Sequence, residues 1–347
     1  MCCKINQPPP LDSSETTCKA PFYKKSNFDF SLYFQTFQPQ HIKTQNAKFL
    51  EWFIGFTEGD DCFQIFSNRC SFIINQKDIA LLHKIRTLLG FGEVMIYIQK
   101  GQKYGRYSVQ SQKGCLRLAI LFNGNLVLEK TNLRFHKWVK FMKTSPHFHV
   151  SYPTDKQIQI QSHNIAEVGL NNSWLSGFID AEGCFYARIR KRSRMKTGLQ
   201  LIRKFSLNQK GELDTLTKIN LVLKNTGRVQ TITNLKNLDS IYYKIEIHRI
   251  ESTQILLDYL DNYPCLGQKR LLIQIYRQLN NSVKRKEHLT KDGLKKIQRF
   301  CNRCKKLNNV YFCPLLLPEV CEFTNKLRSY SKARVGRCSR RIIQNQP

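Results

Sequence analysis

Acidic residues are scarce in this sequence of 347 residues. It contains 25 Asp and Glu against 56 Lys and Arg, which gives a formal net charge of +31 at pH 7. Lys and Arg neutralise phosphate groups with strong, salt-sensitive affinity, so an excess of this size favours a polyanionic partner. Nucleic acid is therefore the first candidate ligand.

Long apolar runs and export signals are also missing. No stretch of about 18 apolar residues occurs, which argues against a transmembrane helix and a membrane partner. No signal-peptide pattern is present, so the 13 cysteines are expected to be reduced thiols rather than a disulfide framework. Cys301 and Cys304 could belong to a zinc site with Cys313 and Cys321. The wide spacing of the second pair disfavours it, and zinc is not among the predicted cofactors.

The same short motif occurs twice, at residues 52–63 and 174–185. The two copies read WFIGFTEGDDCF and WLSGFIDAEGCF. Acidic residues fall at the same two places, as Glu58 and Asp60 in the first copy and as Asp180 and Glu182 in the second. One such fragment alone is typical of ordinary packing or of a turn. Two copies in register instead predict two similar halves, each bringing one carboxylate to a shared boundary.

Each copy has the pattern of a helix with a face of small residues. Asn46, Asn172 and Ser173 are plausible N-caps ahead of the two copies. Small residues four positions apart share one helical face; they are Gly55, Gly59, Gly177 and Ala181. Because small residues let two backbones approach closely, we expect the two helices to pack together. Strand-like segments follow each second acid, so both helices should end in carboxylates that suit a hard divalent cation.

The two copies resemble the motif of the LAGLIDADG homing endonucleases, in the single-chain form that carries two motifs. The second copy matches closely, and the first matches a common variant. One departure is Asp61, which stands where the family has Gly, whereas Gly183 keeps the pattern. The resemblance implies an α+β fold of two pseudo-symmetric αββαββα repeats. In such a fold the motif helices pack at the inter-repeat interface, and antiparallel sheets form a DNA-binding saddle.

The order of elements read from the residues agrees with that expectation. Each half reads as helix, two strands, helix, two strands, helix, and both halves share an Asn-Gln-Lys sequence at residues 75–77 and 208–210. We therefore predict five segments. They are an extended lead-in at 1–42, a first repeat at 43–143, a linker at 144–171, a second repeat at 172–282 and a basic extension at 283–347.

The resemblance also implies the site residues and the chemistry. The last acid of each motif, Asp60 or Glu182, would bind a divalent metal, usually Mg²⁺, for hydrolysis of one phosphodiester bond per strand. Gln76 and Gln209 are assigned by position to water or base contacts. Lys113 and Arg249, which follow the second hairpin of each half, are assigned as electrostatic partners. Together these six residues form the predicted catalytic set.

The second half carries a longer and more basic hairpin than the first. From the second acid to the shared Asn it is about eleven residues longer. Strand alternation places Arg188 and Arg190 on one face, and such a ribbon can enter the major groove. The predicted DNA-binding residues of this half are Arg188, Arg190, Lys191, Arg192, Arg194, Lys196, Arg203 and Lys204. A weaker counterpart in the first half is formed by Lys100, Lys103 and Arg106. Unequal halves indicate a long, asymmetric target read by a monomer.

Three classes of function remain open at the level of sequence. The first is a site-specific, metal-dependent double-strand DNA endonuclease. The second is an intron-encoded RNA maturase that assists splicing, since a basic saddle does not distinguish the two polymers. The third is a cleavage-deficient DNA-binding relative, for which Asp61 is the only hint. Abundant Lys, Asn, Ile, Phe and Tyr suggests an AT-rich genome, and a chloroplast or mitochondrion is the expected location.

Overall fold

The computed structural model describes residues 27–36, 46–60, 62–99, 101–145, 166–234 and 237–311. Asp61 and Lys100 lie outside the described residues, as do Cys313, Cys321 and most of the predicted lead-in and linker. In the described part of the chain, no helix combines the length and apolar character that crossing a lipid bilayer requires.

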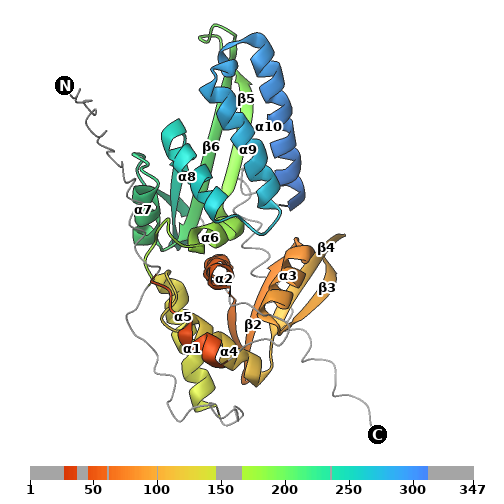
Figure 1. Ribbon diagram of the computed structural model, residues 1–347, viewed down its shortest axis with the longest axis vertical. Coiled ribbons are helices and arrows are strands. Elements are labelled where there is room, and N and C mark those ends of the chain that lie inside the picture. The colour runs from red at the N-terminus through yellow and green to blue at the C-terminus, as the bar shows by residue number, and fades with distance from the viewer. Residues whose placement is uncertain are drawn as a thin grey trace, which may run out of the picture.

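The chain forms two repeats of the same architecture, one above the other in Figure 1. The elements of the first repeat are α2 (Ala47–Gly59), β1 (Phe63–Phe66), β2 (Arg69–Gln76), α3 (Ile79–Leu89), β3 (Glu93–Gln99), β4 (Gln102–Val109), α4 (Gln112–Phe122) and α5 (Glu129–Thr144). Those of the second are α6 (Trp174–Glu182), β5 (Cys184–Lys191), β6 (Leu199–Lys210), α7 (Leu213–Val222), β7 (Gln230–Asn234), β8 (Asn237–Ile247), α8 (Ile250–Asn262) and α9 (Lys269–Lys284).

Each repeat contains one four-stranded antiparallel sheet. The strand orders are β1-β2-β4-β3 and β5-β6-β8-β7, so the two sheets have equivalent topology. The shared Asn occupies the same place in both: Asn75 lies opposite Arg106, and Asn208 lies opposite Lys244. Helices cover one face of each sheet, with Phe72, Tyr107, Phe205 and Ile245 buried beneath them. The predicted α+β fold with two pseudo-symmetric repeats is confirmed.

The described residues include five helices that the sequence pattern did not predict. Each repeat has a further helix between its last strand and its closing helix, namely α4 and α8, so the order is αββαββαα. Residues predicted to be an extended lead-in include α1 (Ser31–Thr36), which carries the buried Tyr33. The predicted basic extension contains the short helix η1 (Glu287–Leu289) and α10 (Lys291–Tyr311). Leu294 and Ile297 of α10 are buried, and Asn308 donates to the carbonyl of Phe185 in β5.

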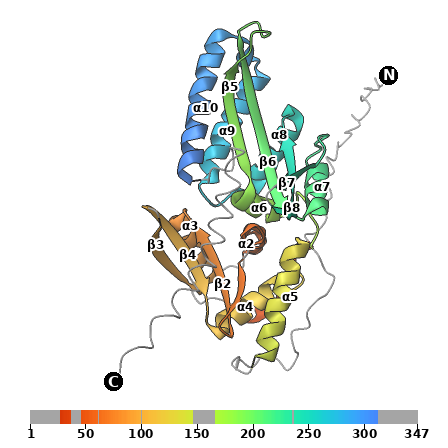
Figure 2. The same cartoon turned by 180° about the vertical axis from the view of Figure 1, so that it is seen from behind.

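The motif helices α2 and α6 pack against each other at the centre of the molecule, between the two sheets (Figures 1 and 2). A Cβ atom on Gly177 would lie 1.9 Å from the carbonyl oxygen of Trp52, and one on Gly55 would lie 2.0 Å from that of Trp174. Further along, a Cβ on Gly59 would meet Cβ of Ala181 at 2.4 Å. Only glycine therefore fits where the two backbones cross, as the small-residue pattern predicts.

The start of each motif helix is fixed by a polar side chain. The Asn46 side chain accepts a hydrogen bond from the amide of Phe49 at 2.9 Å, and Asn172 accepts from that of Trp174 at 3.1 Å. Ser173, the other predicted cap, makes no capping hydrogen bond through its side chain. Its own amide instead donates to Glu51 of α2 at 2.9 Å, so one motif helix also helps to cap the other.

We predict that Gly177→Ala destabilises the fold by about 3 kcal/mol or more, because the new methyl group would overlap a backbone carbonyl that cannot move aside. Chemical denaturation of the purified protein measures the change. Gly227→Ala is the matched control, since its Cβ would meet nothing closer than a side-chain nitrogen at 3.3 Å. Equal midpoints for the two variants would contradict the described helix contact.

Candidate active site

The second acid of each motif lies where its helix ends. Asp60 is the C-terminal cap of α2, and its amide donates to the carbonyl of Thr57. Its Oδ2 accepts a hydrogen bond of 2.6 Å from Nε2 of Gln76, which is the last residue of β2. Gln76, which the sequence assigns to water or base contacts, therefore lies beside the second acid of the first motif.

Glu182 is the last residue of α6 and lies beside the end of α2. A Cβ atom on Gly59 would be 3.2 Å from Cγ of Glu182, and Gly59 is the neighbour of Asp60 in sequence. Gly183 then turns the chain into β5 at a position where a Cβ would lie 2.7 Å from the carbonyl of Ile179. The two acids thus reach the same end of the helix pair.

Lys269 is a buried cation at this end of α6, and the sequence pattern did not assign it to the site. Its Nζ donates to the carbonyls of Ile179 at 2.9 Å and Ala181 at 3.1 Å. Burial lowers the pKa of Lys269, and the negative charges of Asp180 and Glu182 act against that change. The sequence contained a signal for it, because Lys130 and Lys269 occupy equivalent places at the start of the closing helices.

The first acids of the motifs hold the interface together rather than facing the site. Glu58 accepts the indole hydrogen of Trp174 at 2.5 Å, and Asp180 accepts that of Trp52 at 3.0 Å. Each acid also accepts two backbone amides just before the closing helix of its own repeat, at 127–128 or 266–267. The two buried carboxylates therefore join both motif helices and both closing helices.

A second reciprocal pair of contacts fixes the closing helices. Asp78, the N-cap of α3, accepts the amide of Gln268 at 3.0 Å, and Glu212, before α7, accepts that of Lys130 at 3.0 Å. In each case an acid of one repeat binds the beginning of a helix in the other. This arrangement places Lys269 and the end of α6 in a fixed relation to the first repeat.

The carboxylates of Asp60 and Glu182 suit a hard divalent ion that takes only some of its ligands from the protein. Asp60 and Glu182 lie at the adjacent C-terminal ends of the two motif helices, and no group of three or more His, Cys, Asp or Glu side chains suited to a metal occurs within the described ranges. Mg²⁺ typically takes one or two carboxylates and completes its octahedral shell with water and substrate phosphates. Such a site suits a metal ion that also binds a phosphodiester substrate better than it suits a structural metal ion.

The other three predicted site residues differ in position: Gln209 reaches the end of α2, whereas Lys113 and Arg249 lie farther away. Nε2 of Gln209 lies 3.5 Å from the carbonyl of Glu58, so it reaches the end of α2 across the interface. Lys113 lies in the first turn of α4, and Arg249 caps α8, where it contacts Thr226 and Glu251. Both helices start about 13 Å along the strands from the shared Gln residues. The assignment of Lys113 and Arg249 beside the acids is therefore wrong.

The long hairpin β5–β6 presents a row of arginines on the face that no helix covers. Phe185 and Ala187 are buried against the helices, whereas Arg188 and Arg190 lie on the opposite face. Nε of Arg190 and Nη1 of Arg192 both lie 2.9 Å from Oε1 of Gln200. The strand β5 has 8 residues and β1 has 4, so this ribbon reaches roughly 13 Å further than its counterpart.

The remaining predicted DNA-binding residues divide between the two faces. Arg194 and Lys196 lie in the β5–β6 turn, and Lys204 lies on the open face above the ring of Tyr186. Lys103 and Lys191 lie at exposed strand ends on the helical side. The assignment of Arg203 to DNA binding is wrong, because its side chain is buried under the helices and donates to Oγ1 of Thr253 at 3.1 Å.

In the first repeat, Arg106 is held on the open face of the sheet. Its Nε donates to Oδ1 of Asn75 at 2.9 Å, and its guanidinium lies 5.5 Å from the ring centroid of Tyr97. Tyr97 in turn stacks on Tyr104. With Nε occupied, the terminal nitrogens of Arg106 are the part of the side chain that can bind a ligand.

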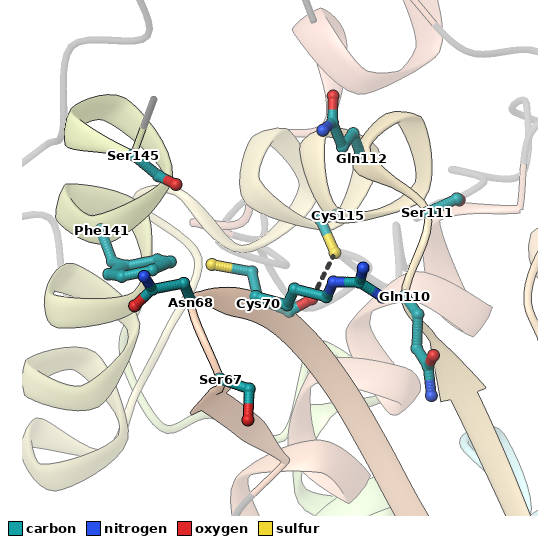
Figure 3. A pocket seen from close by; sticks show the side chains of 10 residues that line it. Ser67, Asn68, Cys70, Gln110, Ser111, Gln112, Cys115, Phe141 and Ser145 are labelled. Atoms are coloured by element: carbon teal, nitrogen blue, oxygen red, sulfur yellow. Dashed lines mark hydrogen bonds between the residues drawn. The ribbon is translucent and has the colours of Figure 1, made fainter. Parts of the chain in front are cut away.

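Two other features do not contribute to this site. A cavity of about 560 Å³ lies between the β1–β2 turn, the start of α4 and the end of α5 (Figure 3), and its described lining includes no carboxylate. Cys301 and Cys304 are buried in α10, where burial raises the pKa of both thiols. Both side chains belong to the hydrophobic core, where a cysteine packs as a small apolar residue.

Comparison with known protein families gives a consistent result. The family model described as LAGLIDADG endonuclease matches residues 53–142 and 175–280, which include the C-terminal part of each motif helix and both sheets. Among curated proteins, the chain is 27% identical over 263 residues to a probable intron-encoded endonuclease 4 of Neurospora crassa. The match covers 74% of this chain but only 44% of that relative.

Two further relatives are encoded in introns. An uncharacterized cox1 intron-2 protein of Schizosaccharomyces pombe is 25% identical over 75% of this chain and 74% of its own length. The intron-encoded RNA maturase bI4 of Saccharomyces cerevisiae is 28% identical over 182 residues, which is 50% of this chain and 26% of the relative.

Solved structures with the same fold include two meganucleases. I-AabMI bound to uncleaved DNA is 26% identical, with a TM-score of 0.55, and the match covers 74% of this chain and 98% of that one. I-SmaMI bound to an uncleaved DNA target in the presence of calcium ions is 19% identical, with a TM-score of 0.55 and coverages of 75% and 98%.

The free energy of unfolding should depend on pH through the buried side chain of Glu58. Burial raises the pKa of Glu58 to about 8, against the opposing effect of its three N–H donors. From about pH 4.5 to pH 8 the folded protein keeps a proton on Glu58 that the unfolded chain has released. The free energy of unfolding should therefore fall as pH rises through this window.

Glu58→Gln cannot titrate, so its stability should fall less between pH 5 and pH 8 than that of the unsubstituted protein. It should also be less stable at pH 5, because a Gln amide would direct a donor at Trp174. Urea denaturation at several pH values measures both effects. Glu251→Gln, which changes a 72%-exposed side chain, should follow the parent profile. A Glu58→Gln profile as steep as the parent's would contradict the assignment.

Proposed function

The chain belongs to the LAGLIDADG endonuclease family, and we propose on that premise that it is a site-specific double-strand DNA endonuclease of the homing type. The observation that supports the proposal is the placement of Asp60 and Glu182 at the same end of two helices that touch through glycine. The chain spans less than half of the Neurospora relative, so the activity is proposed for these 347 residues and not for the whole of that longer protein.

The proposed substrate is a long, asymmetric DNA duplex bound along the open faces of both sheets. Arg188, Arg190 and Arg192 line the extended ribbon of the second repeat, whereas the first repeat offers Arg106 on a shorter ribbon. A two-stranded ribbon of this width fits the major groove of B-DNA. The unequal ribbons would read unequal half-sites, which a monomer with two different repeats can do.

In the proposed reaction the protein holds the metal ions and positions the scissile phosphates. Asp60 and Glu182 would hold divalent ions, Mg²⁺ by preference, and when bound such ions supply Lewis-acid stabilisation of the phosphate. Gln76 orients the Asp60 carboxylate through its 2.6 Å hydrogen bond. Lys269 compensates the charges of Asp180 and Glu182 and fixes the last turn of α6.

The gene is proposed to lie in an intron of an organellar genome. The relatives named for introns of cox1 and ND4 support this location. In that setting the duplex formed by joining the sequences on either side of the intron supplies the candidate target.

RNA binding in intron splicing is the second candidate function. The RNA maturase of Saccharomyces cerevisiae supports it, since that relative is 28% identical to half of this chain. Splicing of the host intron with and without the protein tests it directly. A cleavage-deficient DNA-binding protein is the third candidate, and it is tested by the cleavage experiment below.

We predict that Asp60→Asn and Glu182→Gln each abolish Mg²⁺-dependent double-strand cleavage while binding of the target duplex survives. The carboxylates are needed for metal, and the basic sheet faces supply most of the affinity. Plasmid cleavage and gel-shift assays measure the two properties. Asp292→Asn, at a side chain 92% exposed on α10, is the control and should cut normally. Undiminished cutting by both site variants would refute the assignment.

A further inference from the structure

On the open face of the second sheet, an acid lies among the cations of the described residues. Glu246 lies in β8, and its side chain is 14% exposed. Nζ of Lys204 and Nζ of Lys244 each lie 2.5 Å from the same oxygen, Oε1 of Glu246. Nε2 of His248 lies 3.3 Å from the other oxygen, Oε2. A carboxylate here holds two ammonium groups side by side.

This cluster lies close to the candidate active site. Cys184, two residues beyond Glu182, pairs with Ser206, and Ser206 pairs with Glu246 on the next strand. The cluster therefore lies on the row of the sheet that starts where the motif helix α6 ends. A duplex bound along the sheet would meet it within a few base pairs of the scissile phosphates.

The charge of the cluster suits base contacts better than phosphate contacts. Partial burial by itself raises the pKa of the Glu246 carboxyl, but hydrogen bonds and charges from Lys204 and Lys244 outweigh burial and lower that pKa to about 2. The carboxylate is therefore ionised at neutral pH and cancels one of the two positive charges. A phosphate clamp would lose affinity by such an arrangement.

Two adjacent donors whose combined charge is reduced from two to one match the major-groove edge of guanine, which presents O6 and N7 as neighbouring acceptors. Lys contacts to these atoms are a common basis of specific recognition. The carboxylate removes the mutual repulsion of the two ammonium groups and fixes their directions. Without it, each flexible Lys side chain would turn toward the nearest phosphate.

The first repeat holds its basic side chain at the equivalent position by different contacts. Arg106 and Lys244 occupy equivalent positions, each opposite the shared Asn of its repeat. Arg106 is held by the neutral Asn75 and by Tyr97, so it keeps its full charge. Lys244 is held by a carboxylate instead. Equivalent positions of the two half-sites therefore meet different groups.

We propose that Glu246 is a specificity-determining residue that positions Lys204 and Lys244 to read a guanine in the half-site of the second repeat. The inference rests on the proposed function, since it requires that DNA bind along the open sheet faces. Glu246 acts through the two lysines, so it is a positioning residue rather than a catalytic one.

The test is selection of preferred duplexes from a library of randomised DNA, carried out with the full chain. The parent protein should select a guanine at one position near the centre of the second half-site. Glu246→Gln should lower that preference about tenfold, the size of one base contact, while total affinity for DNA stays equal or rises. Lys244→Met should lower the same preference at the same position.

Two further variants separate this effect from a change of net charge. Asp261→Asn removes an acid paired with Arg277 on the helical side and should leave the selected sequence unchanged. Arg190→Gln with Arg192→Gln should flatten the dependence of affinity on salt, whereas Glu246→Gln should not. Thermal unfolding of each variant establishes that it is folded.

Failure of the proposed role of Glu246 can be told apart from failure of the proposed DNA endonuclease function. A parent protein that selects a sequence, together with a folded Glu246→Gln variant that selects the same guanine as strongly, overturns the role of Glu246 alone. If Lys244→Met keeps the guanine while Glu246→Gln loses it, the lysine-based reading is wrong. A parent protein that selects no sequence overturns the proposed function, and the inference with it.

Discussion

The close approach of α2 and α6 is the constraint on which the rest of the structure depends. Gly55 and Gly177 let each helix backbone touch the carbonyl of a Trp in the other. The indoles of those two Trp residues then donate hydrogen bonds across the interface to Glu58 and Asp180. The same two carboxyl groups also accept backbone amides from the loops that precede the closing helices. One contact surface thus fixes two helices, two loops and the separation of the second acids. A looser interface would still bury apolar area, but it would not bring Asp60 and Glu182 to one place.

Much of this could be predicted from sequence because the motif is written twice. Repetition in register shows that Glu58 and Asp180 are equivalent, and that Asp60 and Glu182 are equivalent. The four-residue spacing of small residues predicts that the two helices pack closely. The helices α4 and α8 were missed because each follows a strand after only two residues, which leaves little loop sequence to mark where the helix begins. Arg203 was misplaced because its charge suggested the surface, whereas strand alternation puts it opposite Ala187 in the core. Lys269 was overlooked since a buried lysine gives no signal beyond its position.

The two repeats have the same order of elements but differ in the side chains on the sheet faces that would contact a ligand. The first has a short ribbon and a single Arg held by Asn and Tyr, and the second has a long ribbon with a row of arginines and a carboxylate-bound pair of lysines. Helix α10 packs behind that ribbon through a face containing Ile297 and Cys304. A strand pair that extends beyond its sheet needs such support, because an isolated two-stranded ribbon is only marginally stable. The asymmetry therefore has a structural basis outside the motif.

The position of bound metal tests the account most directly. In crystals of the protein with its target duplex and Mn²⁺, anomalous scattering locates the ions without assumptions about the ligands. We predict ions at the paired ends of α2 and α6, within coordination distance of the carboxylates of Asp60 and Glu182. Ions bound elsewhere, with these two carboxylates apart and facing away from the DNA, would contradict it.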